Sequence, residues 1–481
     1  MSISSALHAA KSGLRTTSLQ ANTIASNVAN ASTPGYLRRS INLEESLLAG
    51  QTTGVRSVGV SRSENQVLTS QRRDISSDLA QAGLLKGAWN AISTRLGQTP
   101  GSPGLFNTIS KFETAVSQAA QTPESNVALS QLFQTTQDVV TDFNDLAETA
   151  KSLRREADTE IASSVDVVND AVARVSDLNS LIARSDRTSA KAASLMDERD
   201  RALDTISEFL PIQTVERESG TVDILTTEGV FLLAGSQREL RFERSADFSA
   251  GQTRENGERS GLYVGDTEIT PGTSTYAAVS SGVLNGLFAL RDDDMPAFTR
   301  QLDAVATDLM DRLSGTALDP DAPADTPGLF IDSGNGGPGI ASRMTVNSAV
   351  DPAAGGNIQR LRDGLNAATA GPAGNASHLN RIQSALGAQS DISMSGISGR
   401  YSASELTAEF SSVIAQRQYS ADFTHTSLNS QYAIIAEAEQ SATGVDMDSE
   451  LQDLVTVEQA YAANARVIEI ASQMLSRLME L

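Results

Sequence analysis

Apolar side chains recur every seven residues along the last stretch of the chain, residues 445–481. Such a stripe is what one helix needs in order to lie along another. Neither glycine nor proline interrupts this stretch, so it predicts a single helix of roughly 50 Å at about 1.5 Å per residue. The stripe consists of Met447, Leu454, Tyr461, Ile468 and Leu475.

The first thirty residues carry a similar stripe, in alternating steps of four and three. The pattern ends at Ser32-Thr33-Pro34-Gly35, which predicts a helix stop and a turn. Because a long terminal helix does not bury its stripe alone, we expect the two ends of the chain to pair lengthwise. The N-terminal stripe consists of Ile3, Leu7, Ala10, Leu14, Thr17, Ala21, Ile24, Val28 and Ala31.

Two interpretations of the paired ends stay open. One is an ordinary antiparallel helix pair within one domain. The other is a pair that also packs against copies of itself, which the many alanines of both stripes favour because they allow close approach. Such stripes bury little area, so the ends are expected to become ordered on assembly. The predicted assembly contacts are Leu7, Leu14, Ile24, Val28, Leu454, Tyr461, Ile468 and Leu475.

The middle of the chain changes its period twice. Helical spacing predicts a bundle, with helices over 66–96, from 105 to about 122, over 125–153 and over 161–182. Alternation between residues 211 and 276, after one short strand near 55–60, predicts a small antiparallel β module. Helices resume over 282–318 and 378–386 and from residue 403, and the Pro- and Gly-rich stretch 319–374 predicts strands near 329–331 and 344–346.

The predicted fold is therefore mainly α, a nested multi-domain rod. Its terminal helices pair as a coiled coil, a long helical bundle follows, and a small antiparallel β module is inserted. The predicted domains are a terminal coiled coil (1–60 with 436–481), a helical bundle (61–210 with 280–318 and 378–435), a β module (211–279) and a loop-rich region (319–377).

Composition narrows the classes of function. The 481 residues carry 37 basic and 59 acidic side chains, a net charge of −22, which argues against nucleic-acid and anionic-membrane partners. Without cysteine there are no disulfides, thiolate metal sites or cysteine nucleophiles. No apolar run approaches a membrane span, and no cleavable signal peptide is visible. From composition alone the chain reads as cytoplasmic.

Both ends carry a recognisable motif. Residues 19–36 (LQANTIASNVANASTPGY), with GVDMD at 444–448 and QAYAANARVI at 459–468, resemble the opening and closing motifs of the bacterial flagellar rod, hook and hook-associated proteins. Finding both, in this order, is a strong signal, although they cover less than a fifth of the chain. The motif residues are Asn22, Asn27, Asn30, Pro34, Gly35, Tyr36, Gln459, Tyr461 and Asn464.

A second resemblance indicates which branch of this family the chain is most similar to. Val168-Asn169, Leu178-Asn179 and Leu195–Asp200 are similar to the helical domain of the hook-associated protein at the hook–filament junction, whereas hook and rod proteins have mostly strands there. The charged run from Asp197 to Asp200 is otherwise expected to be an exposed, self-paired helix face.

The resemblance implies a structural, non-enzymatic protein that self-assembles into a ring joining hook to filament. It also implies contacts with the hook protein, the next hook-associated protein and an export chaperone. Such proteins leave the cell unfolded through the flagellar type III channel with an uncleaved signal, and lie outside it.

Candidate chemistry is weak elsewhere. Gly334–Gly339 satisfies a dinucleotide-fingerprint spacing, but Pro338 and the strand that follows argue for a turn. Asp292-Asp293-Asp294 more simply caps the helix that begins near Pro296. His8, His378 and His425 lack metal-ligand spacing. No catalytic, cofactor-binding or metal residue is therefore predicted.

Three alternatives remain at this point. A hook or distal-rod protein of the same family would have strands where we expect helices over 66–206. A secreted enzyme or adhesin would need a cleft with converging polar groups within 211–374. A cytoplasmic coiled-coil scaffold would not be exported.

Overall fold

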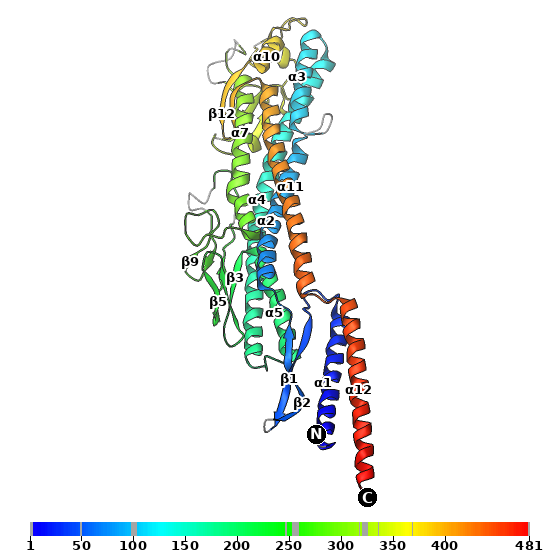
Figure 1. Cartoon of the computed structure of the whole chain (residues 1–481). Coiled ribbons are helices and arrows are strands. Elements are labelled where there is room, and N and C mark those ends of the chain that lie inside the picture. The colour runs from blue at the N-terminus through cyan, green and yellow to red at the C-terminus, as the bar shows by residue number, and fades with distance from the viewer. Residues whose placement is uncertain are drawn as a thin grey trace.

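The structure, a computed structural model, describes residues 3–48, 51–97, 103–245, 248–252, 259–316, 318–319, 326–334, 336–367 and 369–479. The chain forms an elongated, mainly helical rod with small antiparallel sheets (Figure 1). Its two ends lie together at one end of the rod (Figure 1). The predicted fold class, mainly α and nested, is confirmed.

Long helices make up the body of the rod. The predicted helices over 125–153 and 161–182 are one continuous helix of 58 residues, α4. The sequence has no glycine or proline there, and buried residues such as Arg154, Ala157 and Ile161 carry the buried face across the expected break. The body's first helices are α2 (Gln66–Leu96), α3 (Leu105–Gln121), α4 (Asn126–Ala183) and α5 (Ala190–Phe209).

The later helices return to the same bundle. They are α6 (Gly282–Ala289), α7 (Met295–Arg312), α8 (Ile340–Arg343), α9 (Arg360–Asp363), α10 (Ser377–Gly387) and α11 (Ala403–Thr443), with a 3-10 turn at Pro352–Ala354. Aromatic side chains fill the core between them. Phe298 of α7 packs against Phe410 of α11 with ring centroids 5.8 Å apart, and both are fully buried.

The expectation that Asp292–Asp294 caps a new helix is wrong. A π-helical turn, Leu290–Asp294, joins α6 directly to α7. Pro296 has no amide hydrogen to donate, so a widened turn keeps the helix continuous there. Asp292 instead pairs at 2.8 Å with Arg291, a fully buried arginine that also contacts Asp158 at 2.8 Å.

The β module predicted between residues 211 and 276 is confirmed as two small antiparallel sheets. The first has the order β3-β4-β5-β6, and the second β7-β8-β9. Their strands are β3 (Ile212–Glu216), β4 (Val222–Thr226), β5 (Phe231–Ala234), β6 (Ser236–Gln237), β7 (Leu240–Arg241), β8 (Tyr263–Val264) and β9 (Thr267–Glu268).

The other sheets are two-stranded antiparallel pairs. The two strands predicted in the Pro- and Gly-rich stretch are present and pair, as β10 (Phe330–Asp332) and β11 (Met344–Val346). The hairpin of β12 (Ser390–Met394) and β13 (Ile397–Tyr401) was not predicted. Nor was the length of the hairpin that follows the first helix, where one short strand was expected: β1 (Arg39–Leu48) pairs with β2 (Gln51–Arg62).

The first and last helices lie side by side beyond the foot of the body (Figure 1). They are α1 (Ile3–Asn30) and α12 (Met447–Met479), and they run antiparallel. The β1–β2 hairpin packs on another side of α1, where Ser12 Oγ accepts a hydrogen bond from the Val55 amide at 3.1 Å. The terminal unit therefore has three parts: α1, α12 and the hairpin.

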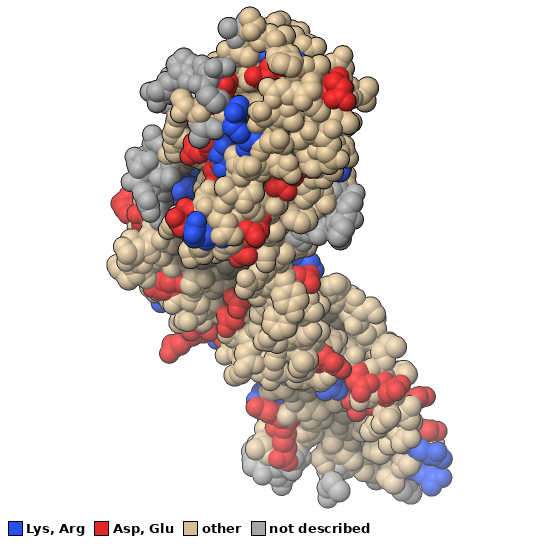
Figure 2. Space-filling view, turned by 90° about the horizontal axis from the view of Figure 1, so that it is seen from above, with Lys and Arg blue, Asp and Glu red and all other residues tan. Residues whose placement is uncertain are grey.

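Acidic side chains are scattered over the face in Figure 2, with wide uncharged areas between them. Within the described part of the chain, no helix has both the length and the apolar character that a membrane span requires.

Candidate assembly interface at the paired ends

The two terminal helices approach closely because α1 presents a glycine to its partner. A Cβ atom added at Gly13 would lie 2.7 Å from the side chain of Asn464, so any larger residue forces either that side chain or the helices to shift. Asn464 in turn donates to the Ala460 carbonyl of its own helix at 3.0 Å. Small and polar residues thus form part of the seam, which suits a narrow helix pair and fixes its register.

A buried asparagine, Asn27, closes the upper end of this pair. Its Nδ2 donates to the Arg39 carbonyl at 2.8 Å and to Glu450 Oε2 at 3.0 Å. Its Oδ1 accepts from the Tyr36 hydroxyl at 2.9 Å and from the Arg39 amide at 3.1 Å. All four hydrogen bonds that an amide side chain commonly makes are formed, so one residue ties α1, β1 and α12 together.

Arginines at the start of β1 extend this cluster in both directions. Arg38 Nε contacts Glu450 of α12 at 2.6 Å, and the Arg38 amide donates to the Thr443 carbonyl at the end of α11 at 2.9 Å. Arg39 contacts Asp197 of α5 at 2.7 Å. We call the whole set the elbow network: Asn27, Tyr36, Arg38, Arg39, Arg62, Asp197 and Glu450.

The expectation of an exposed, self-paired charged face at residues 197–200 is wrong for Asp197 and Arg199. Asp197 is only 3% exposed and forms ion pairs with Arg39 at 2.7 Å and with Arg62 at 2.8 Å. Arg199 is also buried and donates to the Gly220 carbonyl at 2.7 Å. Burial raises the pKa of the Asp197 carboxyl, and the two arginines offset part of that rise. Glu198 is partly exposed, but it pairs with the exposed Arg174 of α4 rather than within its own helix.

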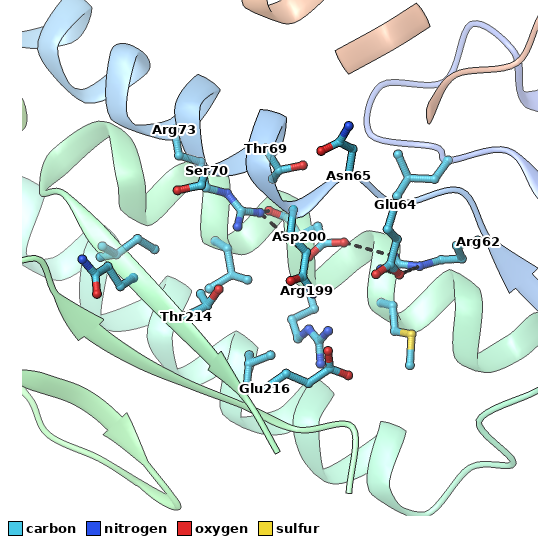
Figure 3. Close-up of a pocket in the computed structure, with 17 residues that line it drawn as sticks. Arg62, Glu64, Asn65, Thr69, Ser70, Arg73, Arg199, Asp200, Thr214 and Glu216 are labelled. Atoms are coloured by element: carbon cyan, nitrogen blue, oxygen red, sulfur yellow. Dashed lines mark hydrogen bonds and ion pairs between the residues drawn. The ribbon is translucent and has the colours of Figure 1, made fainter. Parts of the chain in front are cut away.

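A polar cavity of about 370 Å³ lies beside the elbow network, between α2, α5 and β3 (Figure 3). Arg62 and Arg73 converge there on Asp200, at 3.0 Å and 3.8 Å, and Arg62 also contacts Glu64 at 2.5 Å. The lining residues include neither histidine nor cysteine. The cavity therefore offers paired charges at a joint rather than a nucleophile with its base.

The glycine-rich loop that satisfies a dinucleotide spacing is occupied by the chain's own carboxylates. Asp332 accepts from the amides of Gly334 (2.9 Å) and Gly336 (3.1 Å), and Asp303 from those of Gly339 (2.6 Å) and Ala341 (2.9 Å). A phosphate would need these same amides. Asn335 of the motif lies outside the described residues.

The histidines do not come together as a metal site. His8 is exposed on α1, while His378 is buried with its ring nitrogen 3.3 Å from the Leu318 carbonyl. Burial lowers the pKa of His378. Over the described ranges, no group of three or more metal-binding side chains is found.

Large apolar side chains stand exposed along much of α12. Each is between 41% and 85% exposed, on a helix that a single copy of the chain covers on one side only. Water-exposed apolar surface of this extent marks an interaction surface. The residues are Met447, Leu451, Val455, Tyr461, Val467, Ile470, Met474, Leu475 and Met479.

Three models of known protein families match three parts of this chain. Residues 90–316 match the model of the helical domain of flagellar hook-associated protein FlgK. Residues 7–36 match that of the flagella basal body rod protein, and residues 440–481 that of the C-terminal part of the flagellar basal body rod FlgEFG proteins. The two rod-protein models thus fall on the two helices that pair.

Flagellar hook-associated protein 1 of Bacillus subtilis (strain 168) is 22% identical to this chain, over 98% of this chain and 97% of its own length. The chain belongs to the family of flagellar hook-associated protein 1. The Salmonella typhimurium member is 24% identical over 61% of this chain, and the match spans about half, 53%, of that longer relative. Superposition on the solved hook junction protein FlgK from Burkholderia pseudomallei gives a TM-score of 0.42, with 16% sequence identity. The superposition covers 55% of this chain and 47% of that one, and we draw no conclusion from it.

The motif residues of this family take different positions in the structure. Asn27 is buried in the elbow network, whereas Asn22 is exposed and Asn30 donates only to the Ser26 carbonyl of its own turn. Tyr36 reaches Asn27, and Gly35 adopts a φ of +72° in the turn that ends α1. Pro34, Gln459 and Tyr461 are exposed, and Asn464 meets Gly13.

The predicted assembly residues fall into two groups. Within one copy, some are wholly or half buried: Leu7, Leu14, Ile24, Val28, Leu454 and Ile468. Tyr461 and Leu475, like Met447 of the same stripe, are exposed. The seam instead includes Glu450, Val457, Asn464 and Ala471, which the apolar pattern passed over.

Of the elbow network, sequence reasoning singled out Asn27 and Tyr36 as motif residues and named Asp197 only as part of an exposed face. It missed Arg38, Arg39, Arg62 and Glu450. Arg38 and Arg39 follow the N-terminal motif after a single residue, Leu37, and a pair of arginines at the start of a strand in so acidic a chain was an available signal. Glu450 lies outside the apolar stripe, and no local pattern singles it out. Gly13 interrupts a helical pattern, and such a glycine indicates close approach of another element.

Proposed function

We propose that this chain is a structural adaptor that joins the flagellar hook to the filament by assembling into a ring of identical subunits. The paired ends form the inner layer of that ring, and the helical body forms the layer outside it. The observation that carries the proposal is the exposed apolar face of α12, on a helix whose other side is already packed against α1.

The eight predicted contacts take two roles in this proposal. Leu7, Leu14, Ile24, Val28, Leu454 and Ile468 hold the pair together and fix the shape that it presents. Tyr461 and Leu475 meet neighbouring subunits. The proposed partners are copies of the chain, the hook protein, the next hook-associated protein and an export chaperone. The proposed site of action is outside the cell, after export without a cleaved signal.

The alternatives from the sequence find little support. Helices occupy residues 66–96 and 105–209 almost throughout, where a hook or distal-rod protein would have strands. Within 211–374, a shallow hollow of about 490 Å³ is lined mainly by small residues, and its charged members are already engaged. Arg360 donates to the Leu365 carbonyl at 2.7 Å, and Asp363 pairs with Arg362 at 2.7 Å.

The test is complementation of a strain that lacks the gene. Tyr461→Asp and Ile468→Asp are expected to leave the helical body folded and the chain exported, while filament protein escapes into the medium and the cells do not swim. Tyr276→Asp is the matched control, because this tyrosine is 88% exposed on the β module, far from the termini. Swimming cells that carry Ile468→Asp would refute the proposal.

A further inference from the structure

Helix α11 has a second apolar face that no described part of the chain covers. Tyr419, Phe423 and Ile434 are 72%, 64% and 65% exposed, and the rings of the first two stack with centroids 6.4 Å apart. Spacings of four and eleven residues place the three on one side of the helix. Ile414, on another side, is fully buried in the core of the body. We call the exposed line the α11 ridge: Ser412, Gln416, Tyr419, Phe423, Ser430 and Ile434.

The α11 ridge is uncharged, which is unusual in a chain that carries 59 acidic and 37 basic residues. Between positions 412 and 434, the charged residues of α11 are Arg417 and Asp422, and both are engaged elsewhere. Arg417 lies over the ring of Trp89 at 5.1 Å, and Asp422 contacts Lys86 at 2.7 Å. Both partners belong to α2, so the charges of this stretch are turned toward α2 and away from the ridge.

We propose that the α11 ridge is the surface through which the helical bodies of two neighbouring copies of this chain contact each other. The occupant follows from charge. Copies that each carry a net charge of −22 repel one another, so contact between them needs surfaces free of charge. Exposed stacked aromatics among serine and glutamine meet that requirement and bury apolar area at little cost in conformational entropy.

The ridge also continues the surface already assigned to assembly. Helix α11 ends at Thr443 and α12 begins at Met447, and the two follow one another down the same side of the rod (Figure 1). The exposed apolar residues of α12 begin at Met447, so the ridge leads toward the exposed apolar face of the terminal pair, with the exposed Glu437 between them. The inference rests on the proposed function and extends it, because it gives the outer layer its own lateral contact.

A photocrosslinker placed on the ridge identifies the occupant directly. Phe423 is replaced by p-benzoylphenylalanine. The variant is then irradiated in two samples, one of cells with assembled flagella and one of the purified monomer. We expect an adduct at twice the 50.6 kDa mass of one chain, made only of this protein and only in flagella. An adduct with any other protein, or none, overturns the inference. A second probe at Ser430 repeats the measurement if the first prevents incorporation.

Substitution then separates this contact from the inner layer. Phe423→Asp is expected to be folded and exported but incorporated into junctions at least tenfold less than Tyr276→Asp, the exposed aromatic control. Equal incorporation of the two overturns the inference. If Tyr461→Asp and Ile468→Asp still fail to assemble in that case, the proposed function stands without the ridge. If those two variants assemble, the proposed function itself falls.

Discussion

Replacing Asn27 with alanine is expected to loosen the terminal pair while leaving the helical body intact. The substitution removes four hydrogen bonds from a side chain that is 1% exposed. Each neutral bond contributes about 1 kcal/mol, and the bond to the Glu450 carboxylate about 2 kcal/mol. Glu450 keeps Arg38, and the half-buried Tyr36 hydroxyl can turn to water, so we expect a net loss of about 2–4 kcal/mol.

Hydrogen exchange of the purified chain measures this loss, because it reports local opening segment by segment. At about 1.4 kcal/mol for each factor of ten, amides of α1 and α12 near Asn27 and Glu450 should exchange roughly 30- to 700-fold faster. Amides of α4 should not change. The apolar stripes alone predict order only on assembly. The elbow network changes that expectation for the upper half of the pair, and the exposed far half of α12 should still fray.

Asn22→Ala is the matched control, since Asn22 belongs to the same family motif and lies on the same helix but is exposed. Asn22→Ala should change the free energy of local opening near Asn27, as read from hydrogen exchange, by less than about 0.5 kcal/mol. The reasoning is refuted if the two variants behave alike, or if the wild-type chain shows no protection in α1 near Asn27.

Two further substitutions test the elbow and the seam. Asp197→Asn leaves a buried arginine without its counter-charge and should cost about 2–4 kcal/mol, read from faster exchange of the Val60 amide, which donates across the same interface. Glu198→Gln should change the opening free energy of the Val60 amide by less than about 0.5 kcal/mol. Equal effects of the two substitutions on that amide would contradict the geometry. Gly13→Ala should weaken the helix pair by about 1–3 kcal/mol despite alanine's better helix propensity. Adding Asn464→Ala should restore exchange in α1, and a single variant that is already more stable would show that the seam is not tight.

The elements of the body could be predicted from sequence because their signals are local. A 3.6-residue period in the helices and a two-residue period in the β module each reflect which side chains face the core. The division of α4 into two helices failed because the apolar pattern weakens near Arg154 and Asp158. These residues are buried by distant partners, the Arg291 carbonyl and the Arg291 guanidinium, 137 and 133 positions away.

The candidate interface was predicted only in outline. Counting apolar residues at seven-residue spacing selected Tyr461 and Leu475, which are exposed, and passed over Glu450, which is 1% exposed. A polar residue becomes buried when long-range partners satisfy it, and no local pattern reveals those partners. The family motif marked Asn27 without showing that it differs from Asn22.

The division between buried polar and exposed apolar residues is itself an argument about assembly. An ordinary two-helix domain buries its apolar residues and leaves its polar residues outside. The terminal unit does the reverse at key positions, with Asn27 and Glu450 buried and Tyr461 and Leu475 exposed. Hydrogen bonds depend on direction, so the network fixes the shape of the pair, while burial of the apolar residues waits for a neighbour. This arrangement suits a subunit that folds first and gains most of its terminal packing energy when the next copy arrives.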